Sequence, residues 1–150
     1  MKYKPLTKTQ KKLQKLAFAV RKNSYSPYSD CKVGAALLTA SGDIFSGCNV
    51  ENSSFGGTTC AEQVAIYSAI AAVGATTITE IVIATDASPP WPPCGICRQI
   101  LTEFTPDPTA VAIHCINPKG EWRSFRLSDL LPEAFTPTDL NKSRRKKRTR

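Results

Sequence analysis

The order of apolar and polar positions divides the chain into short segments with helix or strand periodicity. In segment 6–23, apolar residues recur at helical spacing near one face, which predicts an amphipathic helix that ends near Asn23. These apolar residues are Leu6, Leu13, Leu16, Ala17 and Val20. Segment 33–50 places the turn Ser-Gly-Asp between two apolar runs, and this order is typical of a β-hairpin.

Segment 60–73, CAEQVAIYSAIAAV, is apolar on nearly all sides, which predicts a buried helix that ends at Gly74. Threonine is a common residue at a helix start because its hydroxyl can accept from an unpaired backbone N–H. We therefore expect Thr58 or Thr59 to cap this helix.

The second half of the chain predicts three further strands and two further helices. The strands are expected at 78–85, 109–116 and 121–126, a helix at 94–105, and a short helix with a C-terminal arm at 127–135. Helix, hairpin, helix, strand, helix, strand, strand is an α/β order in which helices pack on a mixed sheet.

Size and charge predict one folded unit with a basic end. The chain has 150 residues, enough for a single domain with its own core, and 41% of them are hydrophobic. The net charge is +8, but 7 of the 20 basic residues lie in 141–150, which leaves 13 bases and 12 acids in the rest. We therefore expect one folded domain at 1–138 and a basic, disordered tail at 139–150 that could adhere to nucleic acid.

The sequence also indicates in which cellular compartment the protein is expected. The first residues lack the sustained apolar core of a signal peptide, and the longest apolar stretch, 64–73, is too short to cross a bilayer. We expect a cytoplasmic protein without a membrane partner, where a reducing environment makes a C-x-x-C motif a metal or redox site rather than a disulfide.

Two predicted helices begin with cysteines. One starts with Cys-Ala-Glu at Cys60, and the other carries Cys94 and Cys97 in a Pro-Cys-Gly-Ile-Cys motif. If both helices lie on the same side of the sheet, their N-termini can bring three sulfurs together, where unpaired N–H groups favour thiolates. Three sulfurs with the fourth position open for water define a catalytic Zn²⁺ site, with one ion per chain.

Glu62 lies two residues after Cys60, at the same helix end. A carboxylate beside the metal that does not bind it can carry protons between water and substrate. Cys48 and Cys115 lie in predicted strands, where we expect small buried hydrophobic residues, and we expect His114, the only histidine, to be structural as well.

Over residues 25–135 the chain resembles the small cytidine deaminases whose zinc ligands are three cysteines. The resemblance rests on three ordered motifs: PYSDCKVGAALLTASGDIFSGCNVENSSFGGTTCAEQVAI, PPCGICRQIL and LLPEAF. It implies a three-layer sandwich with a mixed five-stranded sheet and helices on both faces. It also implies hydrolytic deamination of cytidine or deoxycytidine, with Glu62 protonating the ring and then the departing amine.

The resemblance further implies substrate contacts and an assembly. Asn49 and Glu51 match residues that bind the ribose hydroxyls, and the backbone amide of Ala61 matches one that binds the pyrimidine carbonyl. Phe135 matches an aromatic residue that a neighbouring subunit places over the base, and Phe55 matches a residue at a subunit boundary. These matches imply a homotetramer with shared active sites.

Two positions depart from the family pattern. Cys31 stands where the family usually has a phenylalanine against the pyrimidine, so we expect weaker binding or room for a larger substrate. Gln63 replaces an arginine that commonly donates to the sulfurs and offsets the charge of three thiolates. Arg98 and the two helix N-termini would then have to supply more of that compensation.

Two other classes of function remain open from the sequence. The substrate could be a different aminopyrimidine nucleoside, such as a blasticidin-like antibiotic, or cytosine within RNA or DNA. Alternatively, the chain could be a non-catalytic zinc module that binds nucleic acid through its basic tail, although Glu62 and the open fourth position argue against it.

Overall fold

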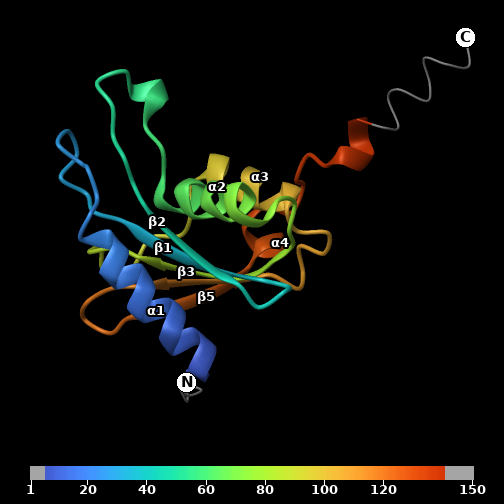
Figure 1. Ribbon diagram of the computed structural model, residues 1–150, viewed down its shortest axis with the longest axis horizontal. Coiled ribbons are helices and arrows are strands. Elements are labelled where there is room, and N and C mark those ends of the chain that lie inside the picture. Colours follow the sequence, from blue (N-terminus) through green and yellow to red (C-terminus); the bar gives the residue numbers. More distant parts are fainter. Residues whose placement is uncertain (1–5, 141–150) are drawn as a thin grey trace, which may run out of the picture.

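The computed structural model describes residues 6–140 and has the three-layer architecture predicted from the sequence. A five-stranded sheet with strand order β2-β1-β3-β4-β5 separates helix α1 on one face from helices α2 and α3 on the other (Figure 1). The strands are β1 Gly34–Thr39, β2 Ile44–Cys48, β3 Ile78–Ala84, β4 Ala112–Ile116 and β5 Trp122–Arg126. The helices are α1 Lys8–Arg21, α2 Ala61–Val73, α3 Gly95–Glu103 and α4 Leu127–Leu130, with a short 3₁₀ turn η1 at Phe55–Gly57.

Strand directions determine where the helices begin. Strand β1 is antiparallel to both β2 and β3, and β3 is parallel to β4, so β2, β3 and β4 all run the same way. Helix α2 follows β2 and helix α3 follows β3. Both helices therefore start from the carboxyl ends of strands that point to the same edge of the sheet.

Helix α1 covers one face through the apolar stripe that the sequence predicts. Leu13 and Ala17 are fully buried in a cluster with Ala36 of β1 and Val82 of β3. Thr7 caps the helix by accepting from the backbone N–H of Gln10 at 3.1 Å, a donor that has no partner within the helix.

The prediction of a buried helix holds for one face of α2 but not for its outer side in this single chain. Ala65, Ile66 and Ala69 are completely buried against the sheet. Tyr67 and Val73 lie on the outer side and are about half exposed, because no further layer covers α2 among the described residues.

The predicted cap of α2 is also wrong: Cys60, not Thr58 or Thr59, is the N-cap residue. Thr59 donates its N–H to the Val50 carbonyl and accepts from the Val50 N–H, both at 2.9 Å. This pairing keeps the backbone extended through Thr59, so the helix cannot begin before Cys60.

Two findings concern the ends of the chain and its exterior. The basic run 142–150 lies outside the described residues, as does most of the segment 139–150, so the tail and its boundary stay predictions. Within residues 6–140, none of the helices combines the length and apolarity that crossing a bilayer requires.

Gly47 in β2 allows α2 to approach the sheet closely. A Cβ at this position would lie 2.4 Å from the Ala65 nitrogen and 2.8 Å from the Ala61 carbonyl oxygen. Both atoms belong to the backbone of α2, so the helix would have to move away from the sheet.

We therefore expect Gly47→Ala to lower the free energy of unfolding by about 1–3 kcal/mol, the usual cost of overpacking. Urea denaturation measures this change. Gly56→Ala is the matched control, because a Cβ there meets nothing within 4 Å, and it should change stability by less than about 0.5 kcal/mol. Equal stability of the two variants would contradict the close approach.

Candidate active site

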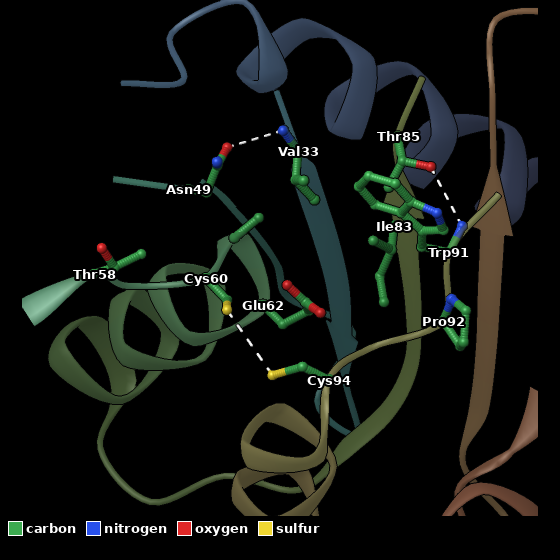
Figure 2. A pocket seen from close by; sticks show the side chains of 11 residues that line it. Val33, Asn49, Thr58, Cys60, Glu62, Ile83, Thr85, Trp91, Pro92 and Cys94 are labelled. Carbon is green, nitrogen blue, oxygen red and sulfur yellow. Dashed lines mark hydrogen bonds between the residues drawn. The ribbon is translucent and has the colours of Figure 1, made fainter. Parts of the chain in front are cut away.

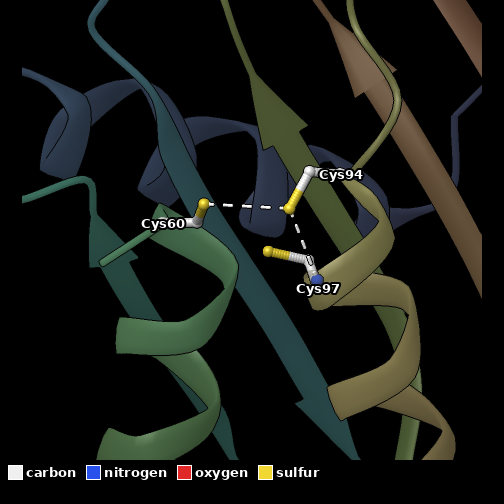
Figure 3. A group of neighbouring side chains, drawn as sticks. All are labelled: Cys60, Cys94 and Cys97. Atoms are coloured by element: carbon white, nitrogen blue, oxygen red, sulfur yellow. Dashed lines mark hydrogen bonds between the residues drawn. The ribbon is translucent and has the colours of Figure 1, made fainter. Parts of the chain in front are cut away.

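The two helix starts bring three cysteines together at one edge of the sheet (Figure 3). Cys60 is the N-cap of α2, Cys94 is the N-cap of α3, and Cys97 lies in the first turn of α3. Their Sγ atoms all lie within 4.8 Å of one another, and those of Cys60 and Cys94 are 4.0 Å apart. The convergence predicted from the sequence is confirmed.

The spacing of these sulfurs fits a zinc ion. Zinc–sulfur bonds of about 2.3 Å at tetrahedral angles place two sulfurs about 3.8 Å apart. The observed separations are close to this value, and thiolates are ligands that zinc prefers. The structure therefore provides three ligands of a tetrahedral site, in which a fourth position would face the adjoining cavity.

The thiols of Cys60 and Cys97 differ in acidity. A hydrogen bond with Cys97 lowers the pKa of Cys60 to about 7. The same hydrogen bond, together with burial and the nearby Glu62 carboxyl, raises the pKa of Cys97. Without a cation the Cys60 thiol therefore ionises before the Cys97 thiol, and a cation between the sulfurs would favour the thiolate form of both.

Glu62 lies in the first turn of α2, next to the cluster but outside it. Its side chain is almost completely buried, with 5% of the residue exposed, and this burial raises the pKa of its carboxyl. A buried carboxyl group beside a metal site, facing a cavity, is a typical proton carrier.

A cavity of about 190 Å³ opens beside the cysteines and Glu62 (Figure 2). Its walls come from both helix starts, from β3, from the residues next to the ends of β1 and β2, and from the two loops that lead into α2 and α3. The lining residues are Val33, Asn49, Thr58, Cys60, Ala61, Glu62, Ile83, Thr85, Trp91, Pro92 and Cys94.

Asn49 lines this cavity and also holds the loop before β1. Its Nδ2 donates to the Cys31 carbonyl at 2.8 Å, and its Oδ1 accepts from the Val33 N–H at 2.8 Å. The Ser24 hydroxyl donates to the same oxygen. An amide side chain offers two donors and two acceptor positions, so one N–H of Asn49 remains for a ligand.

Glu51 lies outside the cavity lining and holds a neighbouring turn. Its carboxylate accepts from the Tyr28 N–H at 2.9 Å, from the Ser29 N–H at 3.2 Å, and from the Ser29 hydroxyl. The Ser29 hydroxyl is the main reason that the pKa of Glu51 is lowered. A carboxylate can accept about four hydrogen bonds, so one position stays open.

Gln63, which lacks the charge of the usual arginine, and Arg98, which is expected to compensate for it, are both engaged with the backbone. Gln63 uses its Oε1 to accept from the Cys60 N–H at 2.8 Å. Arg98 donates from Nε to the Pro93 carbonyl and from Nη1 to the Leu130 carbonyl, each at 2.8 Å. Arg98 thus connects the loop before α3 to the end of α4.

The structure does not bring every predicted substrate residue to the cavity. Cys31 lines a separate, smaller cavity of about 80 Å³, next to Trp91. Phe55 and Phe135 lie away from both, with 77% and 58% of their surfaces exposed. Gln99 donates to the Phe135 carbonyl at 2.7 Å and so holds the C-terminal arm near α3.

Several lining residues were not predicted as part of the site. Val33, Ile83 and Thr85 come from positions in or beside strands, where their apolar pattern signals only a core. Trp91 stands between prolines in the loop before α3. A tryptophan in a polar, proline-rich loop is unusual, and this was the one signal in the sequence that could have identified a lining residue.

The only histidine and the two cysteines expected in strands, Cys115 and Cys48, lie outside the cysteine cluster. His114 is buried, and its Nε2 pairs with Glu80 at 2.8 Å while its Nδ1 pairs with the Ser124 hydroxyl at 2.7 Å. Cys115 is fully buried, which raises its pKa to about 12, while Cys48 is only partly buried. The structure thus places none of the three in the cysteine cluster.

Comparison with known proteins bears on the same residues. Residues 7–113 match the family described as the cytidine and deoxycytidylate deaminase zinc-binding region. This match includes Cys60, Glu62, Cys94 and Cys97. The chain belongs to this deaminase family.

Individual relatives agree with this assignment. A cytidine deaminase from Halalkalibacterium halodurans is 41% identical over 129 residues, which cover 86% of this chain and 96% of the relative. One from Mycobacterium tuberculosis is 38% identical over 122 residues, covering 81% and 86% of the two chains. A crystal structure of cytidine deaminase from Burkholderia pseudomallei superposes with a TM-score of 0.78 at 41% identity, covering 87% of this chain and all of the other.

We expect Cys94→Ala to lose bound zinc, because two sulfurs cannot hold the ion as three do. Metal analysis of the purified protein should find one zinc per wild-type chain and far less in the variant. A chelator should lower the melting temperature of the wild type but leave that of Cys94→Ala unchanged.

Cys48→Ala is the control for removing a thiol outside the cluster, and it should keep its zinc and its response to chelator. A Cys94→Ala protein with a full complement of zinc would remove Cys94 from the ligand set.

Proposed function

We propose that the protein is a zinc-dependent hydrolase that converts cytidine or deoxycytidine to uridine or deoxyuridine and ammonia. The observation that carries this proposal is Glu62, a buried carboxyl that borders the cavity beside three metal-binding sulfurs without belonging to them. A purely structural zinc site has four protein ligands and no need for such a group.

The roles of the protein groups follow from their positions. When bound, zinc supplies Lewis-acid activation of the attacking water. Glu62 takes one proton from this water and delivers it to N3 of the pyrimidine while the water oxygen forms a bond to C4. Glu62 then moves the remaining proton of that oxygen to the amino group, and the C4–N bond breaks to leave a C4 carbonyl and release ammonia. The Ala61 N–H, at the first position of α2, has no partner within the helix and donates to the pyrimidine carbonyl.

In this proposal Asn49 and Glu51 bind the ribose. Each keeps one hydrogen-bonding position after its contacts within the protein: an N–H donor on Asn49 and an acceptor position on Glu51. Sugar hydroxyls can both donate and accept, so they complement this pair. The loop contacts fix the orientation of both side chains before the ligand arrives.

We place the enzyme in the cytoplasm as a homotetramer. A reducing compartment keeps the three thiols available to the metal. The exposed apolar groups support association between copies, since Phe55, Tyr67 and Phe135 are all large, apolar and at least about half exposed. Phe135 from one subunit would then close the cavity of another.

A single panel of assays distinguishes the proposed substrate from a blasticidin-like nucleoside and from cytosine in a polynucleotide. It also distinguishes an enzyme from a non-catalytic zinc module. Cytidine, deoxycytidine, a blasticidin-like nucleoside and a cytosine-containing oligonucleotide are each followed by the loss of the aminopyrimidine absorbance. We expect turnover of the first two. Turnover of the antibiotic alone or the oligonucleotide alone would replace the proposed substrate, and no turnover with zinc bound would favour a non-catalytic zinc module.

We expect Glu62→Gln to keep its fold and zinc but to lose at least about 10²–10⁴-fold in kcat, because the amide cannot carry the proton. Metal analysis and circular dichroism establish the first part, and steady-state kinetics with cytidine the second. Glu103→Gln changes an exposed carboxyl of α3 and should behave like the wild type. Wild-type turnover by Glu62→Gln would exclude Glu62 from the reaction.

A second expectation separates free nucleoside from polynucleotide substrates. The loops 51–59 and 86–93, which border the cavity, contain no lysine or arginine to bind phosphates. Deleting residues 142–150 should therefore leave kcat/KM for cytidine within about twofold of the full chain while weakening any binding to nucleic acid. Efficient deamination of an oligonucleotide by the shortened protein would contradict a nucleoside substrate.

A further inference from the structure

Trp91 is the only aromatic residue among those that line the cavity beside the cysteines. Figure 2 shows its indole next to Ile83, on the opposite side of the pocket from Cys60. Half of the residue, 51%, is exposed, although tryptophan is among the side chains that gain most from burial. The proposed substrate brings a planar pyrimidine ring into this cavity. A ligand that packs on the exposed indole would explain why Trp91 is not buried by the protein itself.

The backbone that carries Trp91 is held in place on both sides. Its N–H donates to the Thr85 hydroxyl, just beyond β3, at 3.4 Å. The carbonyl of the preceding residue, Pro90, accepts from Arg123 of β5 at 3.3 Å, and Pro92 follows. Pro90 and Pro92 restrict the backbone on both sides of Trp91. The loop therefore holds the indole at the cavity in a fixed position.

Trp91 also separates this cavity from the smaller one that Cys31 lines. The smaller cavity has a volume of about 80 Å³, and Trp91 contributes to the walls of both. Cys31 offers no ring to a ligand and lines the smaller cavity but not the larger one. Among residues 6–140, Trp91 is the only aromatic residue that lines the cavity beside Glu62.

We propose that Trp91 is a specificity-determining residue whose indole packs against the pyrimidine and holds the ring in line with Glu62. The proposal rests on the proposed function and extends it by assigning the apolar wall of the base pocket. Val33 and Ile83 line the same cavity and complete that wall. The contact is made equally with substrate and product, because both are planar pyrimidines, so it acts on binding more than on the chemical step.

Kinetics of Trp91 variants test this inference in the zinc-loaded, full-length enzyme. Trp91→Ala should raise KM for cytidine about tenfold to a hundredfold, the range found when an aromatic partner of a base is removed, with kcat changed less than about threefold. Trp91→Phe should stay within about threefold of wild type, while Trp91→Leu, apolar but not planar, should resemble Trp91→Ala.

Fluorescence supplies a second measurement that does not depend on turnover. The chain has two tryptophans, and Trp122 lies on β5 with its ring against His114, 4.9 Å between centroids. In a Trp122→Phe protein, saturating uridine should change the emission of Trp91. In a Trp91→Phe protein the remaining emission, from Trp122, should not respond.

Two results would overturn the assignment: a KM for Trp91→Ala within twofold of wild type, or emission of Trp91 that does not change when uridine saturates the site. Either result leaves the proposed function intact, provided that the wild type deaminates cytidine. Absence of cytidine turnover by the wild type would instead reject the proposed function itself.

Discussion

The site depends on two helices that start at the same edge of one sheet and lie side by side on one face. Strands β2 and β3 run in the same direction with β1 between them. Neighbouring strands are about 4.8 Å apart, so these two are separated by about 10 Å, which is also the usual distance between packed helices. The helices that follow the two strands therefore fit next to each other, and their N-termini meet without distortion of either.

Charge is the second constraint, and it is met by the backbone rather than by side chains. Three thiolates and one Zn²⁺ carry a net charge of about −1, and Gln63 cannot add the positive charge that an arginine would. Arg98 is committed to two carbonyl groups, although it stays near the cluster. At the start of α3 the Cys97 N–H donates to the Cys94 Sγ at 3.5 Å, so the helix start itself supplies a positive partner for a sulfur.

Local motifs were sufficient to predict the fold and the metal cluster but not the shape of the pocket. Cys94 and Cys97 are three residues apart, and Glu62 follows Cys60 by two, so their relative positions are set by a single helical turn. Trp91 approaches Ile83 only because a loop turns back over β3, and no short-range pattern encodes that. The threonine cap failed for a similar reason, since pairing between Val50 and Thr59 overrides local preference.

The hydrogen bonds of Arg98 affect local unfolding of the protein. Arg98 follows the ligand Cys97 directly, and its guanidinium group joins the loop before α3 to the carbonyl of Leu130. Loosening the first turn of α3 therefore removes one of the contacts that hold the end of α4, although Leu127 stays anchored in the core. Local opening at the cysteine cluster and at the end of α4 is coupled through this one side chain, and we expect the amide exchange rates of the two segments to change together when Arg98 is replaced.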